Sequence, residues 1–198
     1  MNFQELVDAV ASRTGYGHLS TLLISLCKSA LIKLHNTEQF PQDLKQSSLT
    51  AVPSSDLKFS VNLPTDFRSF ESVKVTFPDS SYLELPYRQL SWIKANPYAT
   101  DYFTVIGNSV SFNLSTPASS YQFTYYSNPV IAEPYTAASS WILTQHADAV
   151  IAEACALVFE AVELFDRAQI ERNSGRIFMQ QLVNVGYQPQ AFEAIGEE

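Results

Sequence analysis

The sequence predicts an α+β protein, in which N- and C-terminal helical pairs form a four-helix bundle and an antiparallel β-sheet subdomain is inserted between them. Near both ends of the chain, apolar residues recur every three to four positions, as on one face of a helix. Between residues 41 and 134 they recur at every second position, as in a half-buried strand. Nine of the ten prolines lie in this middle region, whereas residues 139–185 contain none.

The first forty residues are expected to form two helices. Asn2 and Glu5 have the spacing of a capping box, in which each side chain accepts a hydrogen bond from the other residue's backbone amide. The first helix should end at Gly15-Tyr16-Gly17, and the second should cover about residues 18–36. Phe40-Pro41 follows it, and the residue before a proline avoids the α region. The residues expected to face inward are Leu6, Val7, Val10 and Ala11, then Leu19, Leu22, Leu23, Leu26, Ala30 and Leu34.

The middle of the chain is expected to form one small antiparallel sheet of about five or six strands. Gly107-Asn108 is the clearest hairpin turn, because it separates two runs of alternating apolar residues. The prolines fall between the runs, where they do not interrupt strands. One or two helical turns are expected around Trp92. The predicted strands lie within residues 57–63, 73–77, 82–85, 103–106, 110–114 and 121–126.

Two further helices are predicted after the sheet. One begins near Ala147, and its apolar stripe runs from Val150 to Phe165, about five turns. Glu153, Glu160 and Glu163 fall together on another side of this helix, which is therefore expected to be acidic and in contact with water. The second helix should end near Gly186. Its predicted apolar positions are Ile170, Ile177, Phe178, Leu182 and Val185.

This pattern divides the chain into four segments. The segments are residues 1–40 and 137–186 (the helices of the bundle), 41–136 (the inserted β subdomain) and 187–198 (a tail). The tail is too short to add a core element, but it keeps Tyr187, Phe192 and Ile195, which a purely solvated tail would not need. Spaced apolar residues of this kind suit a segment that becomes ordered on a partner.

The charge of the chain argues against tight nucleic-acid binding. The formal net charge is −8, and residues 137–198 alone hold nine acidic residues and three arginines. A protein that grips DNA gathers Lys and Arg on one face, and this chain lacks such a cluster. No apolar run reaches the roughly 18 residues that a membrane helix needs, and no signal peptide is evident. Cys27 and Cys155 lie on apolar helical faces, so buried free thiols are expected rather than a disulfide.

No catalytic, metal-binding or cofactor-binding motif is present in the sequence. His18, His35 and His146 are the only histidines, and none has ligand spacing to a cysteine or carboxylate. Nucleophile elbows, phosphate-binding glycine loops and dinucleotide fingerprints are absent too. We therefore expect no enzyme activity, no metal and no cofactor. The trio of Glu153, Glu160 and Glu163 is more simply explained as a solvated or channel-facing helix side than as a carboxylate site.

The aromatic residues of the β segment leave an alternative open. They could line the face of a carbohydrate- or peptide-binding module, although half-buried strands favour aromatic residues for packing alone. The residues concerned are Tyr82, Tyr87, Trp92, Tyr98, Tyr102, Tyr121, Tyr125 and Tyr126.

Three local features together resemble the head-to-tail adaptor (connector) proteins of tailed bacteriophages, the group that includes tail tubular protein A of short-tailed phages. The first is the opening Phe3-Gln4-Glu5-Leu6-Val7 helix, followed by a second helix that ends near Phe40-Pro41. The second is Asn62-Leu63-Pro64-Thr65-Asp66-Phe67-Arg68, which leads into a strand. The third is Tyr125-Tyr126 with Pro129, followed by Ser140-Trp141-Ile142-Leu143-Thr144-Gln145-His146-Ala147-Asp148. The sequence departs from the group at Ala147, where related proteins often have proline.

The resemblance implies a structural virion protein at the head-tail junction, made in the host bacterial cytoplasm. It implies a homo-oligomeric, twelve-fold ring that joins the portal protein to a tail protein (nozzle or tail-tube) and forms part of the DNA channel used during DNA ejection. DNA would pass without specific binding, and no membrane is involved. In such a ring Tyr187, Phe192 and Ile195 would dock on the portal. Glu153, Glu160 and Glu163 would face the channel, where repulsion of phosphate is useful.

Overall fold

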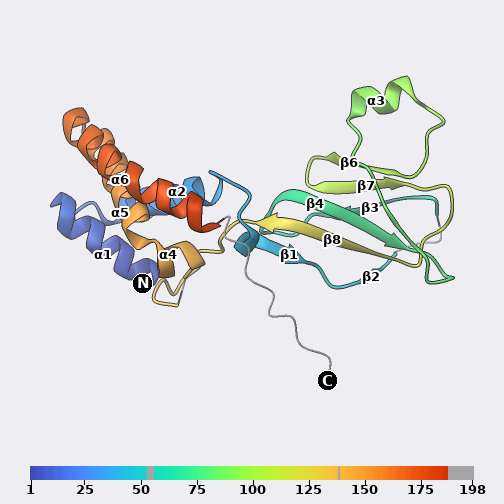
Figure 1. Ribbon diagram of the computed structural model, residues 1–198, viewed down its shortest axis with the longest axis horizontal. Helices are drawn as coiled ribbons and strands as arrows, with labels where there is room; N and C mark the ends of the chain where they lie inside the picture. Colours follow the sequence, from blue (N-terminus) through green and yellow to red (C-terminus); the bar gives the residue numbers. More distant parts are fainter. Residues whose placement is uncertain (53–55, 138, 187–198) are drawn as a thin grey trace. The chain divides into compact units, whose positions relative to one another are not determined.

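A computed structural model of the chain describes residues 1–52, 56–137 and 139–186. These residues contain six α-helices and eight strands, all paired antiparallel, which confirms the α+β class (Figure 1). The helices are α1 (Phe3–Thr14), α2 (Ser20–His35), α3 (Leu90–Ala95), α4 (Trp141–Gln145), α5 (Ala147–Ala161) and α6 (Phe165–Gly186), with a short 3-10 helix, η1, at Pro41–Asp43. The strands are β1 (Leu44–Gln46), β2 (Thr50–Ala51), β3 (Lys58–Asn62), β4 (Phe67–Thr76), β5 (Tyr82–Glu84), β6 (Tyr102–Ile106), β7 (Ser109–Asn113) and β8 (Ser120–Ser127).

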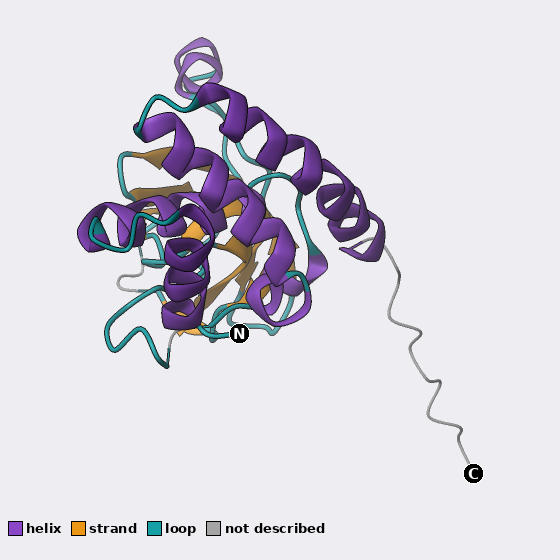
Figure 2. Cartoon of the chain, turned by 90° about the vertical axis from the view of Figure 1, so that its left-hand side faces the viewer, coloured by secondary structure: helices purple, strands orange, loops and turns teal. Residues whose placement is uncertain are grey.

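The chain divides into two compact units, each with its own core. The helical unit consists of residues 1–43 and the described residues from Pro129 onward, and the β unit consists of residues 44–128. Helices from the two ends of the chain therefore share one core, as the sequence predicts. Figure 2 shows the helical unit, in which α6 is the long helix that leads into the grey trace.

Helix α5 lies at the centre of the helical unit, in contact with α1, α2, α4 and α6. A four-helix bundle made of two terminal pairs is not confirmed, since α4 is an additional packed helix. The capping box at Asn2 and Glu5 is confirmed, with both hydrogen bonds 2.9 Å long, and Gly15 ends α1 in the left-handed conformation. On α2 the inward face differs in part from the prediction, because Leu22 is exposed whereas Leu31 is buried.

Helix α6 packs through a different stripe from the one predicted. Ala168, Gly175 and Leu182, spaced seven residues apart, are buried, whereas the predicted core residues Ile170 and Ile177 are 63% and 61% exposed. A shift of two residues is about 200° on a helix, so the two isoleucines face away from the buried stripe. Small residues allow α6 to approach α5 closely: a Cβ added at Gly175 would lie 3.1 Å from the Ala152 Cβ.

The β unit contains two sheets, and the prediction of a single sheet was wrong. One sheet has the order β1-β8-β4-β5, with β2 also paired to β8, and the other has the order β3-β7-β6. Alternate residues of both sheets meet in one core; Phe70 of β4, for example, lies against Phe103 of β6, with ring centroids 5.0 Å apart. Alternation alone cannot tell one sheet from two, because in either case each strand has one buried face.

The predicted β6–β7 hairpin is confirmed. Ile106 pairs with Ser109, which leaves Gly107 and Asn108 as a two-residue loop. Gly107 has a φ of 61° at the first loop position, as a type II′ turn requires. The helical turns predicted around Trp92 are present as α3, which contains no buried residue.

Candidate interaction surfaces

The three glutamates predicted to share one wet helix face lie in different surroundings. Glu153 of α5 forms an ion pair with Lys33 of α2, with a Glu153 Oε1–Lys33 Nζ distance of 2.6 Å, and its side chain is largely buried. Glu160 of α5 pairs with Arg172 of α6 at 2.5 Å. Glu153 and Glu160 are seven residues apart on α5 and so lie on the same side of this helix, but their carboxylates pair with cations on two different neighbouring helices.

Glu163 lies beyond the end of α5, which stops at Ala161 rather than near Phe165. It is exposed and has a φ of 61° in the turn that reverses the chain into α6. Positive φ is strained for a residue with a side chain, so this turn is built against local preference. Of the three carboxylates, Glu163 is the one that the structure leaves at the surface without a described ion pair.

A further ion pair joins the two ends of the chain. The Arg13 guanidinium of α1 donates two hydrogen bonds, 3.0 and 2.6 Å long, to the Glu171 carboxylate of α6. Bidentate pairs of this kind are among the stronger charged contacts, although Arg13 is partly exposed and solvent weakens the attraction. Sequence reasoning did not single out Glu171, since no local spacing links it to a residue 158 positions away.

Most basic side chains of the helical unit are held by internal contacts. Arg13, Lys33 and Arg172 form the ion pairs with glutamate given above. Lys28 donates a 3.2 Å hydrogen bond to the Tyr135 hydroxyl. The Arg167 guanidinium lies 5.9 Å from the centroid of the Phe159 ring. Five of the six basic residues in 1–43 and 129–198 therefore have partners within the unit.

The outer side of α6 is an exposed apolar surface, which we call the α6 outer face and define by Ile170 and Ile177. These residues are exposed, as is Phe165 at the beginning of the helix. Exposed aliphatic side chains repeated along one helix face are typical of a contact surface. The sequence showed the repeat but placed it in the core, because periodicity identifies a stripe without saying what covers it.

A buried polar cluster lies where the chain leaves the helical unit. The His35 imidazole Nδ1 is 2.9 Å from Asp43 Oδ1, and the Trp141 indole N–H donates a 2.7 Å hydrogen bond to the same oxygen. The side chains of His35 and Asp43 are almost fully buried. The cluster fixes η1 against α2 and α4, and sequence reasoning missed it because Trp141 is 98 residues from Asp43 in the sequence and still farther from His35.

Both cysteines are free, as expected, and lie in the helical core. Burial, reinforced by the neighbouring Cys155, raises the pKa of the Cys27 thiol to about 12. Burial and Glu171 raise the pKa of the Cys155 thiol to about 12 as well, against a smaller opposite effect of Arg13. Thiols of this kind stay protonated and are poor nucleophiles near neutral pH.

The aromatic residues of the β unit do not form one platform. Tyr102 and Tyr125 are buried, and Tyr121 packs against the sandwich core. Trp92 packs edge-on against Tyr102, with ring centroids 5.8 Å apart, and Tyr98 stands almost fully exposed by itself. This arrangement gives no support to the alternative of an aromatic binding face.

Neither a cluster of potential metal ligands nor a membrane-spanning helix is found among the described residues. Within them, His, Cys, Asp and Glu side chains nowhere gather in a group of three or more that could hold a metal ion. None of the described helices has the length and apolar character needed to cross a membrane. The predicted portal-docking residues Tyr187, Phe192 and Ile195 lie outside the described residues.

Comparison with known proteins identifies the family of the chain. Residues 1–190 match the family model described as SU10 adaptor protein. Since this match covers nearly the whole chain, the protein belongs to the SU10 adaptor family of phage structural proteins, which are not enzymes. No curated protein matches the sequence. The predicted resemblance to phage head-to-tail adaptors is confirmed at the level of the family, whereas the narrower likeness to tail tubular protein A stays a prediction.

Proposed function

We propose that this phage adaptor protein forms a ring, twelve-fold as the resemblance implies, that joins the portal to the tail and encloses part of the DNA channel. The observation that carries the proposal is the family match over residues 1–190. In this proposal the helical unit, as a bundle, surrounds the channel and the inserted β unit serves the tail side. The chemistry of each surface supports a different part of it.

The charge distribution supports a channel wall that does not bind DNA. Residues 1–43 and 129–198 hold fourteen acidic and six basic residues, whereas residues 44–128 hold six of each. The excess negative charge therefore belongs entirely to the sequence of the helical unit. Because most of its basic side chains already have internal partners, few are available to release counterions from phosphate.

Among the three predicted channel residues, Glu163 has the surroundings that best suit this role. It is exposed and has no described ion pair, so its charge acts outward. Glu153 and Glu160 are partly neutralised by Lys33 and Arg172, and in the proposed ring they contribute mainly by keeping those cations from DNA. The exposed charge of Glu163 and the ion pairs of Glu153 and Glu160 would both weaken the attraction between the channel wall and the phosphates of DNA.

The α6 outer face supports self-association. Ile170 and Ile177 repeat on the side of α6 opposite its buried stripe, so the helix has two apolar sides within one subunit. A second copy of the chain is the occupant we propose for this face. In a closed ring each subunit makes the same contact with its neighbour, so the α6 outer face of every subunit would be covered.

Native mass spectrometry with the cognate portal protein tests this function. We expect a complex that contains several adaptor copies per portal ring with the full chain. The double variant Ile170→Asn/Ile177→Asn should fold normally, since both residues are exposed. It should still bind the portal, but its copies should no longer associate with one another. A chain ending at residue 186 should keep its melting temperature and lose portal binding, because Tyr187, Phe192 and Ile195 are proposed to dock there.

Ile32→Asn is a matched control for the isoleucine variants, because Ile32 is an exposed isoleucine on a different helix, α2. If the full chain formed no complex with portal at any ratio, the adaptor ring would be excluded. Portal binding that survived truncation would exclude the docking role of the tail alone.

A further inference from the structure

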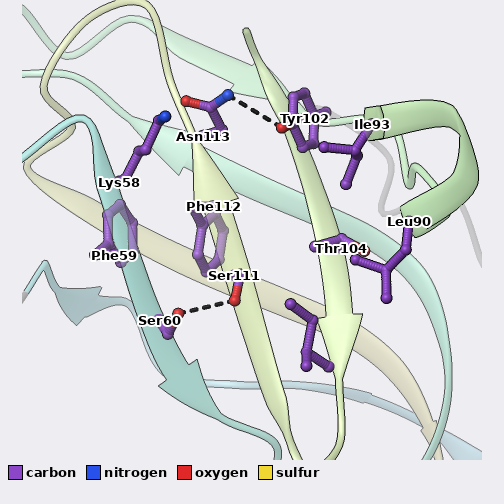
Figure 3. A pocket seen from close by; sticks show the side chains of 11 residues that line it. Lys58, Phe59, Ser60, Leu90, Ile93, Tyr102, Thr104, Ser111, Phe112 and Asn113 are labelled. Carbon is purple, nitrogen blue, oxygen red and sulfur yellow. Dashed lines mark hydrogen bonds between the residues drawn. The ribbon is translucent and has the colours of Figure 1, made fainter. Parts of the chain in front are cut away.

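The outer face of the β3-β7-β6 sheet carries a groove of about 310 Å³ to which the proposed function assigns no role (Figure 3). Its floor includes a row of hydroxyl groups from three neighbouring strands. Ser60, Ser111 and Thr104 occupy matching register positions on β3, β7 and β6. One wall is formed by Leu90 and Ile93 of α3. The whole groove lies within the β unit.

The hydroxyl row contains one buried group that lacks a partner. Ser60 Oγ and Ser111 Oγ are hydrogen-bonded to each other at 2.8 Å. The Thr104 side chain also lines the groove and is 4% exposed, but its Oγ1 has no hydrogen-bond partner among the described residues. A buried hydroxyl without a partner is costly, so a ligand that supplied one would gain from it.

The rest of the groove is apolar at one side and cationic at another. Leu90 and Ile106 are about half exposed, and Ile93 lies beside them on α3 (Figure 3 labels Leu90 and Ile93). Lys58 lines the groove as well, and in the described part of the chain its ammonium group has no ion pair or hydrogen bond. The site therefore offers an aliphatic wall, a free hydroxyl and an uncompensated positive charge together.

We propose that this groove binds an extended peptide segment of another protein, in which an aliphatic side chain stands next to Asp or Glu. The aliphatic side chain would pack against Leu90, Ile93 and Ile106. A backbone amide or carbonyl group would pair with the Thr104 hydroxyl, and the carboxylate would pair with Lys58. This proposal does not rest on the ring, since it concerns only residues of the β unit.

The lining residues favour a peptide over a sugar. Sugar sites present the face of an aromatic ring for stacking, and the rings that line this groove belong to Phe59, Phe112 and Tyr102. All three are less than a tenth exposed. Phe59 and Phe112 stack on each other in the core, with centroids 4.5 Å apart. The groove can therefore bind a ligand through aliphatic contacts and hydrogen bonds to the ligand's backbone.

Titration of the ¹⁵N-labelled full chain with acetyl-Glu-Ile-Gly-amide, followed by NMR, tests the proposal. We expect saturable shifts of the amides of residues 60, 104 and 111 with a Kd on the order of 1 mM, as suits one apolar anchor and one ion pair. The peptide acetyl-Lys-Ile-Gly-amide should bind several-fold more weakly, and acetyl-Glu-Gly-Gly-amide should cause no saturable shift.

Two variants separate the contribution of the Thr104 hydroxyl to peptide binding from that of the Lys58 charge. Thr104→Val keeps the side-chain shape and removes a hydroxyl that has no hydrogen-bond partner in the described part of the chain, so it should fold at least as well and bind about tenfold more weakly. Lys58→Gln should bind the Glu and Lys peptides equally. Thr124→Val and Lys74→Gln, in the other sheet, are matched controls that should titrate like the unmodified chain.

The proposal is wrong if no peptide titrates, or if Thr104→Val binds as tightly as the unmodified chain. Glucose or maltose giving saturable shifts at the same amides, lost in Thr104→Val, would replace the peptide by a sugar as the ligand.

Discussion

Asp66 shows at the scale of one residue how a recognisable sequence feature acquires a structural role. It belongs to the Leu-Pro-Thr-Asp-Phe-Arg segment before β4. Its carboxylate accepts hydrogen bonds from Lys45 of β1 at 2.6 Å and from the Tyr125 hydroxyl of β8 at 3.0 Å. Its backbone carbonyl accepts one from the Asn128 amide at 2.7 Å. One residue therefore joins both ends of the β unit.

Replacing Asp66 should reveal this role in the pH dependence of stability. Partial burial alone would raise the pKa of Asp66, but the hydrogen bonds from Lys45 and Tyr125 outweigh it and hold the pKa below the ordinary 3.8. A carboxyl with a lowered pKa stabilises the fold above pH 3.8, and this contribution is lost as the pH falls through the folded-state pKa. We expect Asp66→Asn to cost about 1–2 kcal/mol at pH 7 in urea unfolding.

The difference between Asp66→Asn and the unmodified chain should shrink below pH 3.8. Asp79→Asn is a control for a purely local contact, since among the described residues Asp79 is hydrogen-bonded to the nearby Ser81 within an exposed turn. The hydrogen bonds from Ser81 also lower the pKa of Asp79, so this variant shows the pH dependence that a local contact produces by itself. Equal stability of Asp66→Asn and the unmodified chain at pH 7 would contradict the role given to Asp66.

At the scale of the element, local rules predicted where helices begin and end better than which side they bury. The capping box at Asn2, the stop at Gly15 and the hairpin at Gly107 follow from short-range chemistry and are confirmed. On α6 the buried side is instead chosen by how closely the backbone can approach α5, which favours Gly175 over Ile177. A hydrophobic pattern cannot express this preference, because it scores the small residue as the weaker core candidate.

The contact surfaces were the least predictable part for a related reason. Glu153, Glu160 and Glu171 are equivalent in the sequence, yet each pairs with a cation on a different element. Their partners are set by packing between distant segments. The hydroxyl of Thr104 is exceptional only because the sheet buries it without a partner among the described residues, which an alternating strand pattern does not reveal.

Substitutions at Gly175 test the close contact between α5 and α6. Gly175→Val should cost about 1–3 kcal/mol of stability, because a Cβ at this position already lies 3.1 Å from the Ala152 Cβ and the added methyl groups have no room. Gly175→Ala should be nearly neutral, since its gain in helix propensity of about 1 kcal/mol offsets the crowding. Thermal unfolding followed by the far-ultraviolet circular dichroism of the helices measures both.

Ser174→Val is the matched control, because Ser174 is the exposed neighbour of Gly175 on the same helix. It introduces the same β-branched side chain without a packing conflict. If Gly175→Val and Ser174→Val melted at the same temperature, α5 and α6 would not be in close contact at Gly175.

At the scale of the whole molecule, the chain enters and leaves the β unit at neighbouring points. Leu44, its first residue, pairs with Tyr126 near the end of β8, and the unit ends at Asn128. The two units have separate hydrophobic cores. A segment with its own core and with adjacent ends has what an independently folding domain requires.

We therefore expect residues 44–128, produced alone, to fold as the same two-sheet sandwich. The amide signals of this fragment in an NMR spectrum should overlay those of the same residues in the full chain, and the fragment should unfold cooperatively in urea. A control fragment that begins at residue 52 lacks β1 and β2, both of which pair with β8, and should be much less stable. An unfolded 44–128 fragment would show that the sandwich depends on the helices.

The pairing of β1 with β8 has an evolutionary consequence. Because the two ends of the β unit lie close together, the helical unit needs only to accommodate it as it would a long loop between two of its helices. Such a module can be exchanged for another, or lengthened, without rerouting the host chain or disturbing the host core. The β unit, with whatever surface it presents, could thus be replaced by a single recombination event while the helices stay as they are.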